Sequence, residues 1–93
     1  MPFDQNSAVE KARQDLASRL GIKESEIDVS GVTPREFPDM SLGAPTDDEM
    51  SAQMIADGWE IKLGAGGKSY EYRADKYQLR LKGYNGKNHV IVY

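Results

Sequence analysis

The sequence of 93 residues contains no cysteine, a single histidine and a single tryptophan. Without cysteine the chain has no disulfide framework, no thiolate metal ligand and no cysteine nucleophile. No apolar run approaches the roughly 20 residues that a membrane-spanning helix requires. The first six residues lack the basic and apolar regions of a secretory signal. These absences favour a cytoplasmic protein that does not bind a membrane.

Basic charge is also scarce, because 12 lysines and arginines stand against 15 acidic residues and give a net charge of -3. A nucleic-acid-binding protein needs a basic face, so nucleic acid is not expected as a partner. Hydrophobic residues make up 39% and charged residues 29% of the chain, as in ordinary folded proteins. A chain of this length forms one core. We predict a flexible N-terminus at residues 1–6 and a single α+β domain at residues 7–93.

An amphipathic helix is predicted at the front of the domain. Asn6 or Ser7 can cap its N-terminus, and Ser7 with Glu10 has the spacing of a capping box. Gly21 suits the left-handed residue that closes a helix. The apolar residues recur at steps of three and four and are Val9, Ala12, Leu16 and Leu20. We expect this stripe to pack on the core.

Alternating apolar and polar residues predict strands in the remainder of the chain. A short strand is expected from Ile27 to Val32, and further strands are expected in the last third. The residues expected to face the helix are Trp59, Ile61, Leu63, Tyr70, Tyr72, Leu79, Leu81, Val90 and Val92. The predicted fold class is α+β, with an N-terminal helix packed on an antiparallel β-meander of four to five strands.

The pair Asn85-Gly86 is a strong signal for a two-residue type I′ turn, because both central positions need positive φ. Such a turn sets Leu81 opposite Val90. It also sets Leu79 opposite Val92, so the apolar faces of the last two strands coincide.

A tight turn at residues 75–76 would likewise pair Tyr72 with Leu79 on the same face. On the other face this register sets Glu71 opposite Arg80, which predicts a charged, solvated surface.

The glycine-rich stretch at residues 64–67 is expected to be a hairpin loop that pairs Ile61 with Tyr70. It lacks the spacing of a phosphate-binding loop and lies between two strands.

The middle segment, residues 33–58, is a long loop broken by Pro34, Pro38 and Pro45, with a helical turn expected within residues 47–56. Loops of this length in compact domains are commonly functional. The candidate binding residues lie here and are Phe37, Asp39, Met40, Ser41, Leu42 and Gly43.

The stretch from Phe37 to Pro45, with Gly58 to Ile61 and Tyr70 to Tyr72, resembles an uncharacterised family of small bacterial domains. Members of that family carry an aromatic-Pro-Asp-x-Ser-Leu-Gly-Cys-Pro segment, followed by a β-meander. This sequence has Ala44 in place of the cysteine. The resemblance implies the fold and names no activity.

Two interpretations of this stretch remain open. In the first, Phe37 and Leu42 plug one end of the core, while Asp39 and Ser41 satisfy the backbone of the loop. In the second, the loop binds a ligand or partner, which outward-pointing Met40 and Leu42 would support.

Catalytic machinery is not evident in the sequence, and we expect no enzyme, no cofactor and no metal. His89 is predicted on the solvated face opposite Lys82, with Ile91 also pointing outward. The acidic run at residues 47–49 lacks the ligand spacing of an EF-hand and suits a helix N-terminus instead.

The function expected from these features is a non-enzymatic module that binds a protein or peptide. One alternative is a small-ligand or metal-binding domain that uses the 37–49 loop. A remote alternative follows from the outline of the fold, which resembles PepSY-type and cystatin-like peptidase-inhibitor modules. The oligomeric state is left open because the last strand can leave a free sheet edge.

Overall fold

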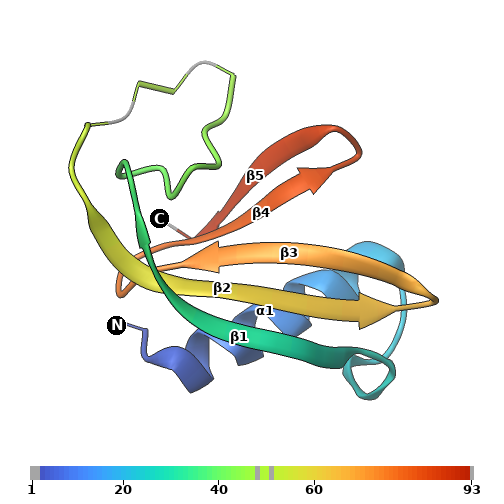
Figure 1. The fold of residues 1–93 in the computed structure, drawn as a ribbon. Helices are drawn as coiled ribbons and strands as arrows, with labels where there is room; N and C mark the ends of the chain where they lie inside the picture. The colour runs from blue at the N-terminus through green and yellow to red at the C-terminus, as the bar shows by residue number, and fades with distance from the viewer. Residues whose placement is uncertain (1–2, 48, 51, 93) are drawn as a thin grey trace.

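The computed structural model describes residues 3–47, 49–50 and 52–92 (Figure 1). This part of the chain forms an N-terminal helix, a short 3-10 turn and a sheet of five antiparallel strands in sequential order. The elements are α1 (Gln5–Leu20), η1 (Glu24–Glu26), β1 (Asp28–Phe37), β2 (Ala56–Ala65), β3 (Lys68–Ala74), β4 (Leu79–Tyr84) and β5 (Lys87–Val92). The predicted α+β class, with one helix and a meander, is confirmed.

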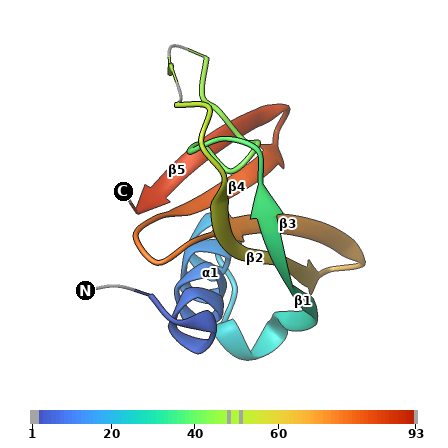
Figure 2. The ribbon, with the colours of Figure 1, turned by 60° about the vertical axis from the view of Figure 1, so that its left-hand side comes forward.

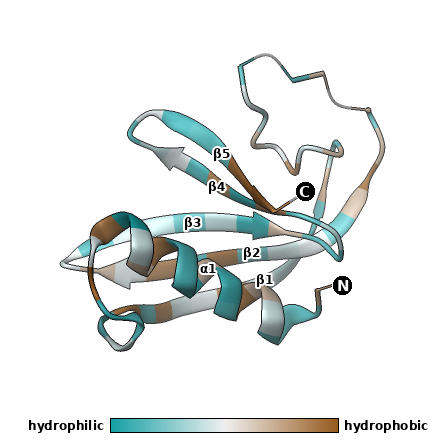
Figure 3. Cartoon of the chain, turned by 180° about the vertical axis from the view of Figure 1, so that it is seen from behind, coloured by the Kyte–Doolittle hydropathy of each residue, from teal (hydrophilic) through white to brown (hydrophobic). Residues whose placement is uncertain are grey.

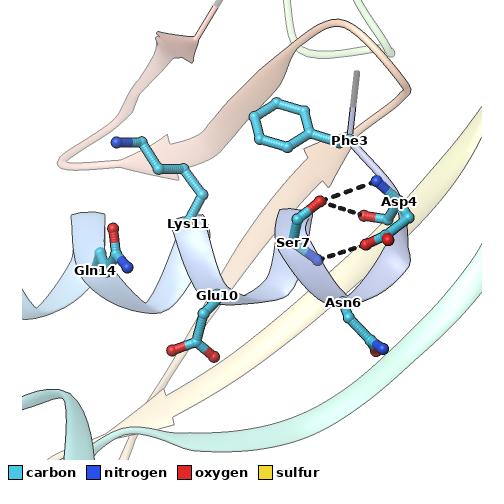
Figure 4. Close-up of a pocket in the computed structure, with 7 residues that line it drawn as sticks. All are labelled: Phe3, Asp4, Asn6, Ser7, Glu10, Lys11 and Gln14. Carbon is cyan, nitrogen blue, oxygen red and sulfur yellow. Dashed lines mark hydrogen bonds between the residues drawn. The ribbon is translucent and has the colours of Figure 1, made fainter. Parts of the chain in front are cut away.

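Helix α1 begins at Gln5 and is capped by Asp4 (Figure 4). The carboxylate of Asp4 accepts a hydrogen bond from the Ser7 backbone N–H at 2.7 Å, and the Ser7 hydroxyl accepts one from the Asp4 N–H at 2.9 Å. The predicted caps, Asn6 and Ser7, and the predicted capping box of Ser7 with Glu10 are therefore wrong. Asp4 is an equally good cap three residues earlier, and it turns Ser7 into the reciprocal partner.

The helix ends at Gly21, as predicted, in the left-handed conformation with φ of 67°. Its buried residues are Ala8, Ala12, Leu16 and Ala17, of which Ala12 and Leu16 were predicted. The helix lies across the face of the sheet formed by β1 to β3 (Figure 3). No helix in the described part of the chain has the length and apolarity to cross a membrane.

Strand β1 is longer than the short strand predicted from Ile27 to Val32, because it continues through Pro34 and pairs Phe37 with Ala56. Proline is tolerated here since β1 is an edge strand. The connecting loop is therefore residues 38–55. The predicted helical turn is absent from the described residues of 47–56, and Ala56 already belongs to β2.

The β2–β3 turn is a two-residue turn at Gly66 and Gly67, with φ of 58° and 79°. It is tighter than the four-residue loop expected from the sequence. Ile61 therefore pairs with Tyr72, not with Tyr70. The shift is two residues, so the apolar side chains still face the helix.

The β3–β4 connection is longer than the predicted tight turn at residues 75–76. The Asp75 carboxylate accepts hydrogen bonds from the backbone N–H groups of Tyr77 at 2.8 Å and Gln78 at 2.9 Å. This arrangement closes a wider turn. Tyr72 consequently pairs with Leu81 and not with Leu79, and the register prediction for this hairpin is wrong.

The predicted turn at Asn85-Gly86 is confirmed, with both residues at positive φ and Tyr84 paired with Lys87. The predicted pair of Leu79 and Val92 is also confirmed.

Between these pairs the register shifts, and Arg80 rather than Leu81 lies opposite Val90. The extra residue is Ile91, which is partly buried and packs against the main core. The prediction that Ile91 points outward is wrong, because a β-bulge redirects the side chains of one strand.

The second face of the sheet carries buried charged side chains instead of the solvated surface predicted from the alternation. Arg73 of β3 is 6% exposed and Arg80 of β4 is 1% exposed. They pair with each other across the two strands, and Glu71 pairs with Lys82 and not with Arg80. The loop between β1 and β2 (green to yellow in Figure 1, upper end in Figure 2) is bonded to both arginines.

Candidate functional site

The first half of the 38–55 loop is anchored by apolar side chains. Phe37 and Leu42 are both fully buried and form a small cluster with Ala56, separate from the core under the helix. Leu42 and Gly43 adopt left-handed backbone conformations, with φ of 59° and 67°. Phe37 and Leu42 are therefore buried, as the plug interpretation expected, but in a cluster of their own and not at the end of the core under the helix. The outward orientation of Leu42, which would have supported a binding role for that residue, is not found.

Asp39 holds the turn that follows Phe37. One of its carboxylate oxygens accepts hydrogen bonds from the Ser41 hydroxyl at 2.6 Å, the Ser41 N–H at 3.0 Å and the Gly43 N–H at 3.1 Å. The Ser41 hydroxyl and the Gly43 N–H hold the pKa of Asp39 below its ordinary value. Asp39 and Ser41 therefore satisfy the loop backbone, as the first interpretation proposed.

Arg73 supports the loop from beneath. Its Nη1 donates to the Leu42 carbonyl at 2.8 Å, its Nε donates to the Glu71 carboxylate at 2.7 Å, and its guanidinium lies 5.4 Å from the centre of the Phe37 ring. A Cβ on Gly43 would lie 2.5 Å from Nη1 of Arg73. A Cβ at position 43 would thus require the Arg73 side chain to shift, and the positive φ of Gly43 also favours glycine.

Arg80 makes the second anchor. Both of its terminal nitrogens donate to the Glu49 carboxylate, Nη1 also donates to the Ala44 carbonyl at 3.2 Å, and Nε donates to Gln78 Oε1 at 2.7 Å. The Gln78 amide in turn donates to the Met40 carbonyl at 2.6 Å. The hydrogen bonds from Arg80 lower the pKa of Glu49. The buried guanidinium is therefore paired and hydrogen-bonded, as burial of a charge requires.

Large apolar side chains protrude from the second half of this loop and from the turn beside it. Met50 is 98% exposed, Ile55 is 69% exposed and Met54 is 63% exposed. We call the methionine surface the set Met40, Met50, Met54, Ile55 and Tyr77, all of which are exposed.

The two halves of the loop are joined by a backbone hydrogen bond, and a cavity lies beside Met40. The Met40 N–H donates to the Ala52 carbonyl at 3.1 Å, which ties the second half of the loop to the first. A cavity of about 210 Å³ lies beside Met40, with Asp75, Tyr77 and Gln78 as its other walls. Its size is suited to one large side chain.

The six residues predicted as a binding site differ in their exposure to solvent. Phe37, Ser41 and Leu42 are buried, Asp39 and Gly43 are half-buried, and Met40 reaches the surface. Met50, Met54, Ile55 and Tyr77 were not among the predicted site residues. In the sequence, Met50, Met54 and Ile55 are apolar residues of the segment that follows Pro45.

Asp39, Ser41 and Glu49, which were considered for ligand or metal binding, are engaged in hydrogen bonds within the domain. Glu49 of the acidic run is bonded to Arg80, and Asp48 lies outside the described residues. In the described ranges no three acidic or histidine side chains gather in a metal-binding arrangement. No helix follows residues 47–49 in the described part of the loop, so the helix N-terminus explanation is wrong.

His89 is half-buried and not solvated as predicted. Its Nε2 lies 3.3 Å from the Tyr84 carbonyl, and its ring meets the Tyr84 ring edge-on at a centroid distance of 5.8 Å. It lies opposite Leu81 and not Lys82.

The depression beside the first turns of α1 (Figure 4) is lined by Phe3, the capping residues and polar helix side chains. Its capping groups are already bonded to each other.

Comparison with known proteins gives a family and no activity. No curated protein and no solved structure matches the chain. A family model described as a domain of unknown function, DUF8738, matches residues 9–82. The match runs from the first turns of α1 into β4, so it includes the whole loop between β1 and β2. It agrees with the expected membership of an uncharacterised family. The chain belongs to the family of domains of unknown function DUF8738.

Proposed function

We propose that the chain is a non-enzymatic module that binds an apolar segment of another protein through the methionine surface. The observation that carries the proposal is the exposure of Met50, Met54 and Ile55 within six residues of one loop. Clustered exposed apolar side chains commonly mark interaction sites. Methionine is frequent at such sites because its flexible, polarisable side chain adapts to different partners.

The support beneath the surface favours binding. Arg73, Arg80 and Asp39 fix the first half of the loop by hydrogen bonds to its backbone, and the bond from Arg80 to Glu49 anchors the chain next to Met50. A loop that is ordered before binding loses less conformational entropy when a partner arrives. The cavity beside Met40 and Tyr77 would take one bulky apolar side chain of the partner as an anchor.

The sheet edge at β1 is less suited to binding by strand addition. Pro34 lies within this edge strand, and the register shifts between Val29 and Gly31. Proline and bulges are the devices that protect edge strands from pairing with other chains. Strand addition at β1 is therefore disfavoured relative to binding by side chains of the loop.

The titratable groups near the loop support a role without catalysis. Asp39 is occupied by backbone N–H groups and a hydroxyl, and Glu49 is occupied by Arg80. A catalytic acid or base must be within reach of a substrate proton, and these carboxylates are committed to the structure.

The test compares wild-type protein with the variant Met50→Ser/Met54→Ser/Ile55→Ser, each immobilised and exposed to an extract of the source cells. We expect a protein that is retained by wild type and lost from the triple variant. Calorimetry with that purified protein should show affinity at least tenfold weaker for the variant, about 1.4 kcal/mol or more.

The matched control is Val29→Ser, which removes an exposed apolar side chain on β1, away from the methionine surface. This control should retain the partner at wild-type affinity. Amide NMR spectra establish that both variants keep the fold. Equal retention of all bound proteins by wild type and triple variant would overturn the proposal.

A further inference from the structure

Strands β3 and β4 separate at the end of the sheet far from the loop. Their pairing ends at Glu71 and Lys82, although β3 begins earlier, at Lys68. In β4 the residue Gly83 takes a left-handed φ of 71°, and the register with β5 shifts before Tyr84. Such irregularities bend a strand. Figure 1 shows the β4–β5 hairpin tilted away from β3.

A cavity of about 430 Å³ fills the space between the separated strands and the end of α1. Its principal lining residues are Leu20, Lys68, Tyr70, Lys82, Tyr84 and Asn85. A neighbouring cavity of about 420 Å³ shares Leu20, Lys68 and Tyr70 and continues toward Ile22. Volumes of this order are typical of sites for small molecules.

Aromatic rings line this cavity and are held in place by the residues around them. The rings of Tyr70 and Tyr84 have centroids 6.2 Å apart. The guanidinium of Arg19 lies 5.4 Å from the centre of the Tyr84 ring, and the His89 ring meets the same ring at 5.8 Å. Asp15 fixes Arg19 by a hydrogen bond of 2.7 Å. The aromatic wall is thus ordered before any ligand binds.

The charge at the cavity rim is positive. Lys68 and Lys82 are both exposed, and neither ammonium forms an ion pair with a carboxylate of the described residues. The carboxylate that lines the cavity, Glu71, is bonded to Arg73 at 2.7 Å. The lining of this cavity therefore carries two lysines and one carboxylate, and that carboxylate is bonded to Arg73.

We infer that this cavity binds a small aromatic carboxylate. Its ring would lie against Tyr70 and Tyr84, and its carboxylate would lie between the ammonium groups of Lys68 and Lys82. Aromatic stacking and charge attraction are then satisfied by one molecule. The inference does not depend on the methionine surface, which lies at the loop and the β3–β4 turn.

The test is a titration of the ¹⁵N-labelled chain with 4-hydroxybenzoate, followed by amide chemical shifts. We expect saturable shifts confined to residues 68–71 and 82–85. The neutral analogue 4-hydroxybenzyl alcohol should bind about tenfold more weakly or worse, because it lacks the charge that faces the lysines.

The variant Lys68→Gln/Lys82→Gln should weaken binding of 4-hydroxybenzoate about tenfold or more. The matched control is Lys11→Gln/Lys23→Gln, which removes two exposed lysines elsewhere and should bind as wild type does. Both pairs lie at the surface, so the fold is retained. The inference is overturned if no saturable shift occurs at millimolar ligand. It is also overturned if the alcohol or the first double variant binds equally well, or if the shifts fall on Met40 and Tyr77.

Discussion

Glu49 and Arg80 lie 31 residues apart in the sequence and form a bidentate ion pair on the second face of the sheet. The Arg80 side chain is 1% exposed and the Glu49 side chain is 18% exposed. The pair ties the loop between β1 and β2 to β4, and the Ala44 carbonyl shares the same guanidinium. The position of the methionine surface therefore depends on an ionic contact as well as on the Phe37 plug.

Loss of the Glu49 carboxylate should destabilise the domain. In Glu49→Ala the buried guanidinium of Arg80 keeps the carbonyl of Ala44 and the side chain of Gln78 but loses its bidentate bonds to the Glu49 carboxylate. We expect a loss of about 2–3 kcal/mol, below the range for a fully buried pair because Glu49 is partly exposed. Urea unfolding measures this loss. The control Glu36→Ala, at an exposed position on β1, should change stability by less than about 0.5 kcal/mol, and equal effects of the two substitutions would contradict the account.

The stabilisation by Glu49 should depend on pH. Hydrogen bonds from Arg80 hold the pKa of Glu49 below its usual 4.5 in the folded chain. A lowered pKa adds stability above the unfolded value, and that stability is lost as the pH falls through the folded value. We expect the difference in unfolding free energy between wild type and Glu49→Gln to be largest at neutral pH and to shrink below pH 4.5. Urea unfolding at a series of pH values measures it, and a constant difference would argue against the pair.

The contact between helix and sheet includes one buried polar link. The Tyr72 hydroxyl donates to the Asp15 carboxylate at 2.7 Å, and Tyr72 is fully buried. Tyr72→Phe should cost about 1–2 kcal/mol, because the hydrogen bond has a charged acceptor that retains Arg19 as a second partner. Tyr77→Phe is the matched control at a 71% exposed position and should cost almost nothing. Thermal unfolding of the two variants measures these costs. Similar melting temperatures would show that the hydrogen bond between Tyr72 and Asp15 does not stabilise the domain.

Glycine is required in β2 by close packing. A Cβ on Gly58 would lie 1.9 Å from the Ala74 carbonyl oxygen and 3.2 Å from the Asp75 Cα. Both contacts are backbone, so they cannot move aside as a flexible side chain would. Gly58→Ala should cost about 3 kcal/mol or more.

Gly31 on β1 is the matched control, since a Cβ there would meet nothing within 4 Å. Gly31→Ala should be neutral or stabilise by up to about 1 kcal/mol, because alanine reduces the freedom of the unfolded chain. Denaturant unfolding of both variants tests the contrast, and equal costs would show that the close approach at Gly58 is not decisive.

The sequence predicts the faces of the strands better than their registers. Ile61 and Tyr72 were placed on the helix side, and both are fully buried there. A register shift of two residues leaves every side chain on its face, so alternation alone does not distinguish Tyr70 from Tyr72 as the partner of Ile61. Only the length of the turn distinguishes the two pairings. The turn at Gly66-Gly67 has two residues, whereas the sequence suggested a loop of four.

The alternation of apolar and polar residues did not predict that the loop between β1 and β2 covers the second face of the sheet. Arg73 and Arg80 occupy polar strand positions that are normally solvated. Their burial depends on tertiary contacts with Leu42, Ala44 and Glu49, at separations of 31 to 36 residues in the sequence. The burial of Phe37 and Leu42 was expected under one of the two interpretations of the sequence.

The central claim, that the second half of the loop presents Met50 and Met54 to a partner, is tested most directly by methionine methyl NMR. The chain has four methionines, which ¹³C-methyl labelling makes visible separately. When the partner protein identified in the affinity experiment is added, we predict that the Met50 and Met54 methyl signals shift or broaden. In a second sample with labelled leucine methyl groups, the signals of Leu16 and Leu79 in the core should stay unchanged. Unchanged Met50 and Met54 signals at saturating partner would contradict the account.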